Sequence, residues 1–385
     1  MTTLQRTLIA WTAAAAIGIG IYQAREAARL RDRSEATSLP ALRAELAQPE
    51  RGSAGSNAAS PPSQPLLLAS SHRIIPSTNS PVPESIRSSQ VYALLTNKVS
   101  KLSLAQVEPY LNSKGRSAAS LLAAFRTTTN ASLLAEAMLK HSSDPQVQFE
   151  AALQLNATPE ERRRWLDAFK QGAPENSLAN YLSASDNLKA GRTEDALQDL
   201  ASASRQHQFQ DYLQDRTQTD EEVYLAAGYP PAEAKLAANA FLVMPYLIQI
   251  RELGQNLISL ANGYQQSGDQ ASRDAALQMA VSLGQRFGTT SGGETLIRQL
   301  VGINVEPAAL RVTDPTSPYG GTGQTVQNRI DQLAQQKETF RSLAAQADPL
   351  WPALSDQDWI GYHRQLAALG EETALRWLVS NHAPH

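Results

Sequence analysis

Histidine is the side chain that most often binds metals or transfers protons near neutral pH, and the sequence contains six of them. Metal-binding histidines usually stand at a fixed short spacing, as in HExxH on one helix, and no such pair occurs. Cysteine is absent, which excludes disulfides, thiolate zinc sites and a cysteine nucleophile. We therefore predict no metal site and interpret the histidines as surface or helix-end residues rather than ligands. They are His72, His141, His207, His363, His382 and His385.

Two glycine-rich stretches precede predicted helices, where backbone amides can hold an anion. They run from Gly288 to Glu294 and from Gly320 to Thr325. Neither contains the Lys-Ser or Lys-Thr pair of a phosphate-binding loop, and neither follows a predicted strand. Loops between helices are the favoured interpretation, with anion binding as the alternative. No cofactor is predicted.

Pairs of acidic residues and one basic run are the other candidates for chemistry. Each acidic pair lies where a helix is predicted to begin, so its carboxylates offset the positive end of the helix dipole. No Gly-x-Ser-x-Gly nucleophile motif occurs. The run from Arg162 to Arg164 would spread over different sides of a helix, which favours a solvated face over contact with a partner or an anionic lipid. We predict no catalytic residues. The acidic pairs are Glu160-Glu161, Glu221-Glu222 and Glu371-Glu372.

The composition indicates an almost wholly helical protein that does not bind nucleic acid. Hydrophobic residues make up 42% of the 385, which is enough for a substantial core. The 34 basic and 37 acidic side chains give a net charge of −3, so no basic field favours nucleic acid. Runs of β-branched residues with period-two alternation are scarce, and no strand pair is predicted.

The stretch from Pro174 to Arg205 predicts a hairpin of two helices. Residues of the first helix are spaced to form one buried face, and Gly191 is expected to end that helix. The second helix is expected to begin at Thr193, whose hydroxyl would cap it. Small side chains on both helices would let them pack closely. The buried faces are predicted to contain Leu178, Tyr181, Leu182, Ser185, Leu188, Ala196, Leu197, Leu200 and Ala203.

This hairpin resembles the tetratricopeptide repeat, a helix-turn-helix unit of about 34 residues that builds solenoids. Asn180 and Asn187 replace two aromatic residues of the family pattern, so the match is partial. A second stretch, from Leu257 to Phe287, resembles such a unit mainly in its first helix. The resemblance implies a superhelix that binds proteins or peptides, and the alternative is an ordinary helical hairpin in an irregular all-α domain. The family spacing is matched by Ala184, Gly191, Ala196 and Ala203.

An uncharged apolar run from Thr7 to Ala24 lies near the N-terminus, between Arg6 and Arg25. Its roughly 18 residues would span about 27 Å as a helix, close to the thickness of a bilayer core. No clear small-x-small cleavage site follows, which favours an uncleaved single-pass anchor at residues 1–24 over a cleaved signal peptide. The arginines after the run favour a cytoplasmic domain, whereas short N-terminal apolar segments behind one or two positive charges often direct export. We predict the extracytoplasmic orientation and keep the cytoplasmic one as the alternative.

The remainder of the chain divides by composition. Residues 25–47 predict a juxtamembrane helix, and residues 48–83, rich in proline, serine and alanine, predict a disordered linker. Residues 84–311 form the expected helical-repeat domain, residues 312–323 a loop, and residues 324–385 a C-terminal cap of helices.

The sequence thus predicts an all-α, irregular superhelix of helical hairpins behind a membrane anchor. Between the two repeat-like stretches, Gln208–Arg216 and Glu221–Ala227 are expected to be two short helices. The predicted function is a scaffold for a protein or peptide partner, attached to the membrane through Thr7 to Ala24. The alternative is a glycan-acting envelope enzyme, in which two carboxylates far apart in the sequence converge in one pocket.

Overall fold

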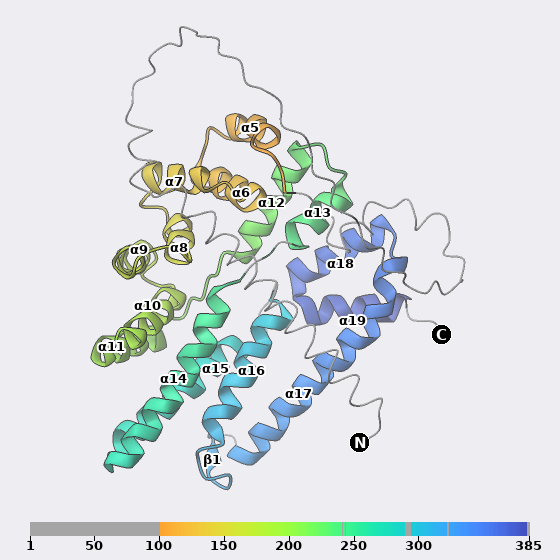
Figure 1. Cartoon of the computed structure of the whole chain (residues 1–385). Coiled ribbons are helices and arrows are strands. Elements are labelled where there is room, and N and C mark those ends of the chain that lie inside the picture. Colours follow the sequence, from red (N-terminus) through yellow and green to blue (C-terminus); the bar gives the residue numbers. More distant parts are fainter. Residues whose placement is uncertain (1–100, 241, 243, 289–293, 322, 383–385) are drawn as a thin grey trace, which may run out of the picture. The chain divides into compact units, whose positions relative to one another are not determined.

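The structure is a computed structural model of the chain, and it describes residues 101–240, 242, 244–288, 294–321 and 323–382 (Figure 1). The predicted anchor, juxtamembrane helix and linker lie outside these residues. Among the helices that the structure describes, none combines the length and the apolar character that a membrane span requires.

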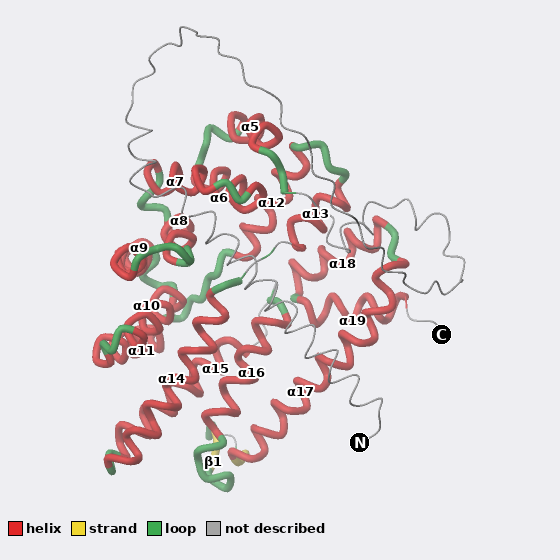
Figure 2. The backbone as a smooth tube through the Cα atoms, in the orientation of Figure 1, coloured by secondary structure: helices red, strands yellow, loops and turns green. Residues whose placement is uncertain are grey.

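The described residues form 15 α-helices, one short 3-10 helix and one pair of two-residue strands (Figure 2). The predicted all-α class is therefore confirmed. The α-helices are α5 (Leu104–Ser113), α6 (Ala118–Thr128), α7 (Ala131–Lys140), α8 (Pro145–Ala152), α9 (Pro159–Gly172), α10 (Ser177–Lys189), α11 (Thr193–Arg205), α12 (Leu213–Ala226), α13 (Pro231–Ala240), α14 (Tyr246–Ser267), α15 (Gln270–Gly288), α16 (Leu296–Leu310), α17 (Val326–Ala347), α18 (Asp356–Leu369) and α19 (Glu371–His382). The strands are β1 (Pro318–Tyr319) and β2 (Gln324–Thr325), and the 3-10 helix is η1 (Asp348–Ala353).

Short-range signals set several of the helix starts. At α8, Oδ1 of Asp144 accepts hydrogen bonds from the backbone N–H groups of Gln146 and Val147, at 2.8 and 3.2 Å. At α9, Thr158 and Glu161 form a reciprocal capping box with two bonds of 3.1 Å. Such caps satisfy N–H groups that have no partner inside the helix, and so they fix where each helix begins.

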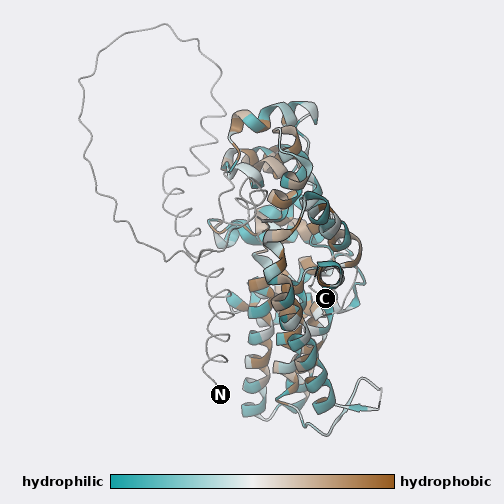
Figure 3. Cartoon of the chain, turned by 90° about the vertical axis from the view of Figure 1, so that its right-hand side faces the viewer, coloured by the Kyte–Doolittle hydropathy of each residue, from teal (hydrophilic) through white to brown (hydrophobic). Residues whose placement is uncertain are grey.

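Apolar faces of these helices pack into three main clusters. One is formed by α8 to α11 with α14 to α16, a second by α5 to α8 with α12 and α13, and a third by α16 to α19. Figure 3 shows apolar and polar residues on the same helices, as expected when one face of each helix is buried. The second cluster joins helices that are distant in the sequence, because α12 packs against α5 and α6, and α13 packs against α12.

The predicted hairpin from Pro174 to Arg205 is present as α10 and α11, which pack against each other. Ala196 and Ala203 of α11 are fully buried, in agreement with the prediction that small side chains lie where the two helices pack closely. Gly191 lies in the turn at a φ of +74°, a conformation that residues with a Cβ rarely adopt.

Two details of the predicted helices were wrong. Thr193 does not cap α11, because the first backbone hydrogen bond of the helix is accepted by Arg192, which is the N-cap residue and provides no side-chain cap. The two short helices expected between residues 208 and 227 are one helix, α12. It begins only after residue 212, because the preceding residues are extended and hydrogen-bonded to the start of α10.

The predicted loop at residues 312–323 contains the first strand, β1, of an unexpected antiparallel pair, and the second strand, β2, follows the loop directly. Pro318 pairs with Thr325 and Tyr319 pairs with Gln324. The hydroxyl of Tyr319 donates a hydrogen bond to the buried Glu306 of α16, which holds this segment against the helix. A contact of this kind cannot be predicted from the local sequence, in which proline and glycine indicated a loop.

Candidate functional site

A groove with a volume of about 380 Å³ lies where the beginnings of α8 and α10, the end of α9 and the segment before α12 meet. We call it the helix-end groove. It is lined mainly by polar side chains and one aromatic ring. They include Asp144, Gln146, Glu175, Asn176, Gln208, Gln210 and Tyr212.

Asn176 fixes one wall of the helix-end groove. Its Oδ1 accepts hydrogen bonds from the N–H groups of Leu178 and Gln210, at 3.2 and 2.9 Å, and its Nδ2 donates to the carbonyl of Gln210 at 2.8 Å. The N–H of Ser177 donates to the carbonyl of Gln208 at 3.0 Å. The extended segment is therefore attached to the start of α10, while the side chains of Gln208 and Gln210 remain exposed.

Tyr212 contributes the aromatic ring of the groove. Its backbone is left-handed, with a φ of +58°, which is unfavourable for a residue with a bulky side chain. Packing holds it there, because its ring lies 5.9 Å from that of Phe149 and 6.3 Å from that of Phe169. Burial raises the pKa of the Tyr212 hydroxyl, and the charges of Asp144 and Asp215 act in the same direction. The hydroxyl is therefore neutral near pH 7 and can both donate and accept a hydrogen bond.

Two carboxylates, Asp144 and Glu175, line the same groove, which is the arrangement that a glycan-acting enzyme needs. Asp144, however, already accepts two backbone hydrogen bonds as the cap of α8, and Glu175 is exposed. Within the described residues no group of three or more histidine, aspartate and glutamate side chains is placed to hold a metal ion.

A second groove, of about 490 Å³, lies between α17 and α19. Leu343 and Val379 form its apolar part, and Glu338 and Arg376 add one charge of each sign. The other lining residues are small or carry amides, and none is an obvious acid, base or nucleophile. They are Gln335, Thr339, Ser342, Gln346 and Ser380.

The four histidines that the structure describes do not form a cluster that could hold a metal ion. His141 bonds the carbonyl of Arg116 through Nε2 at 3.0 Å, and Nε2 of His382 lies 3.3 Å from Oδ1 of Asp358. His207 is exposed, whereas His363, which we had interpreted as a surface or helix-end residue, is buried within α18. That interpretation of His363 was wrong, because the neighbouring Trp359 and Tyr362 place this face of α18 in the core. His72 and His385 lie outside the described residues.

The glycine-rich stretches have structural roles where they are described. The N–H of Leu296, in the first turn of α16, donates to Oε2 of Glu371 at 2.7 Å. The carboxylate of Glu371 thus occupies the N-terminal end of α16. Binding of an anion at this end was the alternative prediction for the first glycine-rich stretch. Glu371 was expected to stabilise only its own helix, but the fold places it against α16, 75 residues away in sequence. The second stretch includes strand β2, and its last residue, Thr325, caps α17 by accepting a hydrogen bond from the N–H of Asn328 at 3.2 Å.

The basic run on α9 also has internal contacts. Nη1 of Arg163 donates to Oδ1 of Asn187 at 3.0 Å, and Arg164 lies over the ring of Trp165 at 5.4 Å. Asn187 in turn donates from Nδ2 to the buried Asp199 at 2.8 Å. The asparagine that departs from the repeat pattern therefore belongs to a polar network joining α9, α10 and α11, and Arg163 is not part of a solvated face.

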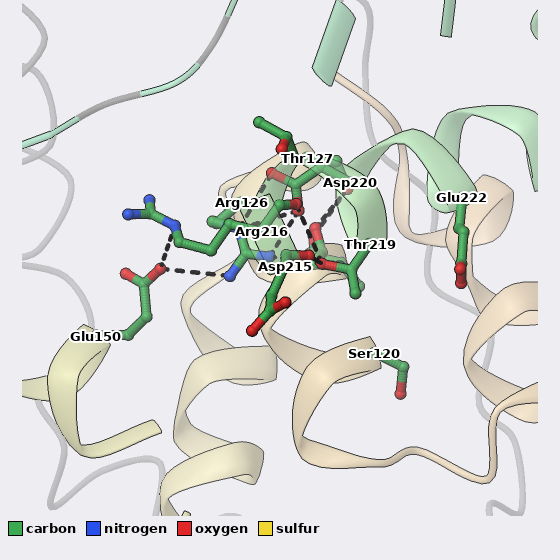
Figure 4. A network of polar contacts seen from close by, with 12 residues as sticks. Ser120, Arg126, Thr127, Glu150, Asp215, Arg216, Thr219, Asp220 and Glu222 are labelled. Carbon is green, nitrogen blue, oxygen red and sulfur yellow. Dashed lines mark hydrogen bonds and ion pairs between the residues drawn. The ribbon is translucent and has the colours of Figure 1, made fainter. Parts of the chain in front are cut away.

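A buried network of charges around Arg126 was not anticipated from the sequence (Figure 4). From Nε and Nη2, Arg126 of α6 donates to the carboxylate of Asp220 of α12, at distances of 2.7 to 3.1 Å. Its Nη1 lies 3.3 Å from Oε1 of Glu150, which is also 3.4 Å from Nε of Arg216. Burial alone would lower the pKa of Arg126, but the charges of Asp220 and Glu150 outweigh burial and raise it.

These four residues join α6, α8 and α12, and none of them lines either groove. Arg126 and Asp220 are 94 positions apart, so no local pattern could have identified the pair. The network is suited to fixing three helices relative to one another, because each charge is paired inside the protein. No protein-family model, curated protein or solved structure matches this chain, and its function must be argued from the geometry.

Proposed function

We propose that this chain is a membrane-tethered scaffold that binds a protein or peptide partner through a domain of degenerate helical repeats. In this proposal Thr7 to Ala24 anchors the chain, and the helical domain lies outside the cytoplasm. The glycan-acting enzyme is the weaker proposal, since it rests on Asp144 and Glu175 and Asp144 is committed to the cap of α8.

The packing of the helix pairs supports the repeat interpretation. Within each of the two repeat-like stretches, consecutive helices pack together, as α10 with α11 and α14 with α15. The two pairs also pack on each other in equivalent positions, because α10 contacts α14 and α11 contacts α15. Neighbouring units of a helical solenoid stack in this way, first helix on first and second on second. Here the two pairs are neighbours in space, while α12 and α13 lie between them in the chain.

The observation that carries the binding proposal is the lining of the helix-end groove. Gln208 and Gln210 present exposed amides, each with a donor and an acceptor, and these match the N–H and C=O groups of a peptide backbone. Tyr212 adds a ring with a neutral hydroxyl beside them. Because Asn176 already holds the backbone of this segment, little conformational entropy is lost when a partner binds.

Affinity purification of the full chain from detergent-solubilised membranes, followed by mass spectrometry, should identify the partner. The double substitution Gln208→Ala/Gln210→Ala is then expected to weaken binding of that partner about 30-fold, since two hydrogen bonds of about 1 kcal/mol each are lost. Both side chains are exposed, so folding should not change. The affinity of the purified partner for each variant can be measured by biolayer interferometry.

The matched control is Gln335→Ala/Gln346→Ala, which removes two amides from the groove between α17 and α19. We expect this variant to bind the partner as the parent does. Equal binding by the parent and both variants would refute the assignment of the groove. Loss of binding only in the control would place the partner at α17 and α19 instead.

Membrane attachment is tested by deletion. Removing residues 1–47 should move the protein from the membrane fraction to the soluble fraction, whereas removing the linker at residues 48–83 should leave it with the membranes. A reporter enzyme that is active only outside the cytoplasm, fused after His385, should be active in the full-length protein. Membrane association that survives the first deletion, or activity of a cytoplasm-only reporter at the same position, would contradict the proposed topology.

A further inference from the structure

A small apolar contact connects α13 with α18, two helices that lie next to each other in Figure 1. Leu236 of α13 and Trp359 of α18 are its buried residues, with Trp351 and Leu354 packed against them. The rings of Trp351 and Trp359 are stacked, with their centroids 5.2 Å apart. With only two buried residues, this contact is much smaller than the main apolar clusters, and its disruption would expose less surface than disruption of any of them.

His363 lies one turn after Trp359 on α18, and only 7% of its surface is exposed. Its ring stacks on Trp359 at 6.1 Å and meets the edge of Tyr362 at 5.3 Å. Neither Nδ1 nor Nε2 of His363 has a hydrogen-bond partner among the described residues, and neither does Nε1 of Trp359. A neutral imidazole tolerates this environment, but an imidazolium would be a buried charge without a partner.

The charged groups around the contact do not stabilise the protonated form of His363. Burial, and then the positive charge of Lys235 on α13, lower the pKa of His363 to about 4. Lys235 itself is paired with Glu221 of α12 at 2.6 Å. Burial and the charge of Asp356 raise the pKa of Glu233. Apart from Tyr224 on α12 and Tyr362 on α18, the titratable or charged side chains on the elements around the contact are Glu233 and Lys235 on α13, Asp215, Arg216, Asp220, Glu221 and Glu222 on α12, Asp348 on η1, Asp356, Asp358 and Arg364 on α18, and Glu371, Glu372, Arg376 and His382 on α19.

We propose that the contact between α13 and α18 is an acid-sensitive latch, which opens when His363 takes up a proton and exposes the imidazole and the Trp359 ring to water. The proposal does not depend on the proposed binding function. The direction follows from linkage. The closed state is fully stable when the pH is above the ordinary pKa of histidine, about 6.5. It loses stability as the pH falls from there toward the lower pKa that His363 has in the closed state.

Hydrogen exchange of the full chain in detergent, measured by mass spectrometry and corrected for intrinsic rates, tests the latch. Between pH 7.5 and pH 5, the ratio of open to closed molecules is expected to rise about 30-fold. Peptides from α18 should lose protection by that factor, while peptides from α10 and α11 should change less than about 3-fold. The substitutions His363→Leu and His363→Phe should abolish the response, because neither side chain titrates.

His382→Gln is the matched control, since it removes a histidine from α19 and should leave the response intact. A response at α18 that persists in both His363 variants, or an equal loss of protection in α10 and α11, would overturn the proposal. If neither His363 variant folds at pH 7.5, the exchange rate of the imidazole C2 proton in the parent decides. A midpoint below about 5 supports the latch, and a midpoint near 6.5 refutes it.

Discussion

Replacement of Gly302 by alanine is expected to lower the free energy of unfolding by about 3 kcal/mol or more. A Cβ at this position in α16 would lie 2.2 Å from the backbone nitrogen of Gly288 and 2.5 Å from the carbonyl oxygen of Gly284, both on α15. Backbone atoms cannot rotate aside as a flexible side chain can, so the two helices would have to separate. Urea denaturation followed by far-ultraviolet circular dichroism measures the change.

Gly263→Ala is the control for this experiment. Gly263 lies in α14, is exposed, and has no atom within 4 Å of the position of an added Cβ. Alanine favours a helix more than glycine does, so this variant should be more stable than the parent by about 0.5 to 1 kcal/mol. The same chemical change is thus expected to act in opposite directions at two positions. A parent-like melt for Gly302→Ala would show that α15 and α16 are not in backbone contact.

Replacement of Arg126 by methionine is expected to cost about 3 to 5 kcal/mol of stability, because it leaves the carboxylate of Asp220 buried without its main partner. The side chains of Arg126 and Asp220 are 11% and 9% exposed, so water cannot replace the lost contacts. The double variant Arg126→Met/Asp220→Leu should recover much of the loss, since the unpaired charge is then removed as well. Urea denaturation of both single variants and the double variant gives the coupling energy.

Arg341→Met on α17 is the corresponding surface control. Arg341 and Glu338 form an ion pair at 3.5 Å with 56% and 72% of their side chains exposed, and such pairs contribute little. We expect this variant to lie within about 0.5 kcal/mol of the parent. If Arg126→Met lowers the free energy of unfolding as little as Arg341→Met does, the network in Figure 4 does not hold α6, α8 and α12 together.

The helices could be predicted where the signals act within one turn. Asp144 with Pro145, Thr158 with Glu161, and Gly191 each fix a helix end through neighbouring backbone atoms, so the sequence alone locates them. The spacing located most of the buried residues of α10 and α11, but Leu188 and Leu197 are only partly buried. The expected single buried face of α10 was wrong, because neighbouring helices cover its other sides as well, including Asn180 and Asn187. Local signals failed before α12, where the extended segment is held by Asn176, more than thirty positions earlier.

The candidate sites could not be predicted, because their residues come from separate segments. The helix-end groove combines residues from three segments, near positions 144, 175 and 210. The sequence of each segment alone indicates only an ordinary helix end or loop. Glu371 caps a helix 75 positions away, and the partner of Arg126 is 94 positions away. His363 could have been recognised as buried from the aromatic residues beside it, but its missing hydrogen-bond partners follow only from the packing of α18.

The joining of α5 to α8 with α12 and α13 in one apolar cluster has a consequence for how the protein is made. Val147 is the last residue that the N-terminal helices contribute, and Val223 is the first from α12, so about 76 residues must be synthesised between them. At typical rates of translation this interval lasts on the order of 4 to 15 s. During that time the apolar faces of α5 to α7 can pack on one another and on α8, but they lack the part of their packing that α12 and α13 provide.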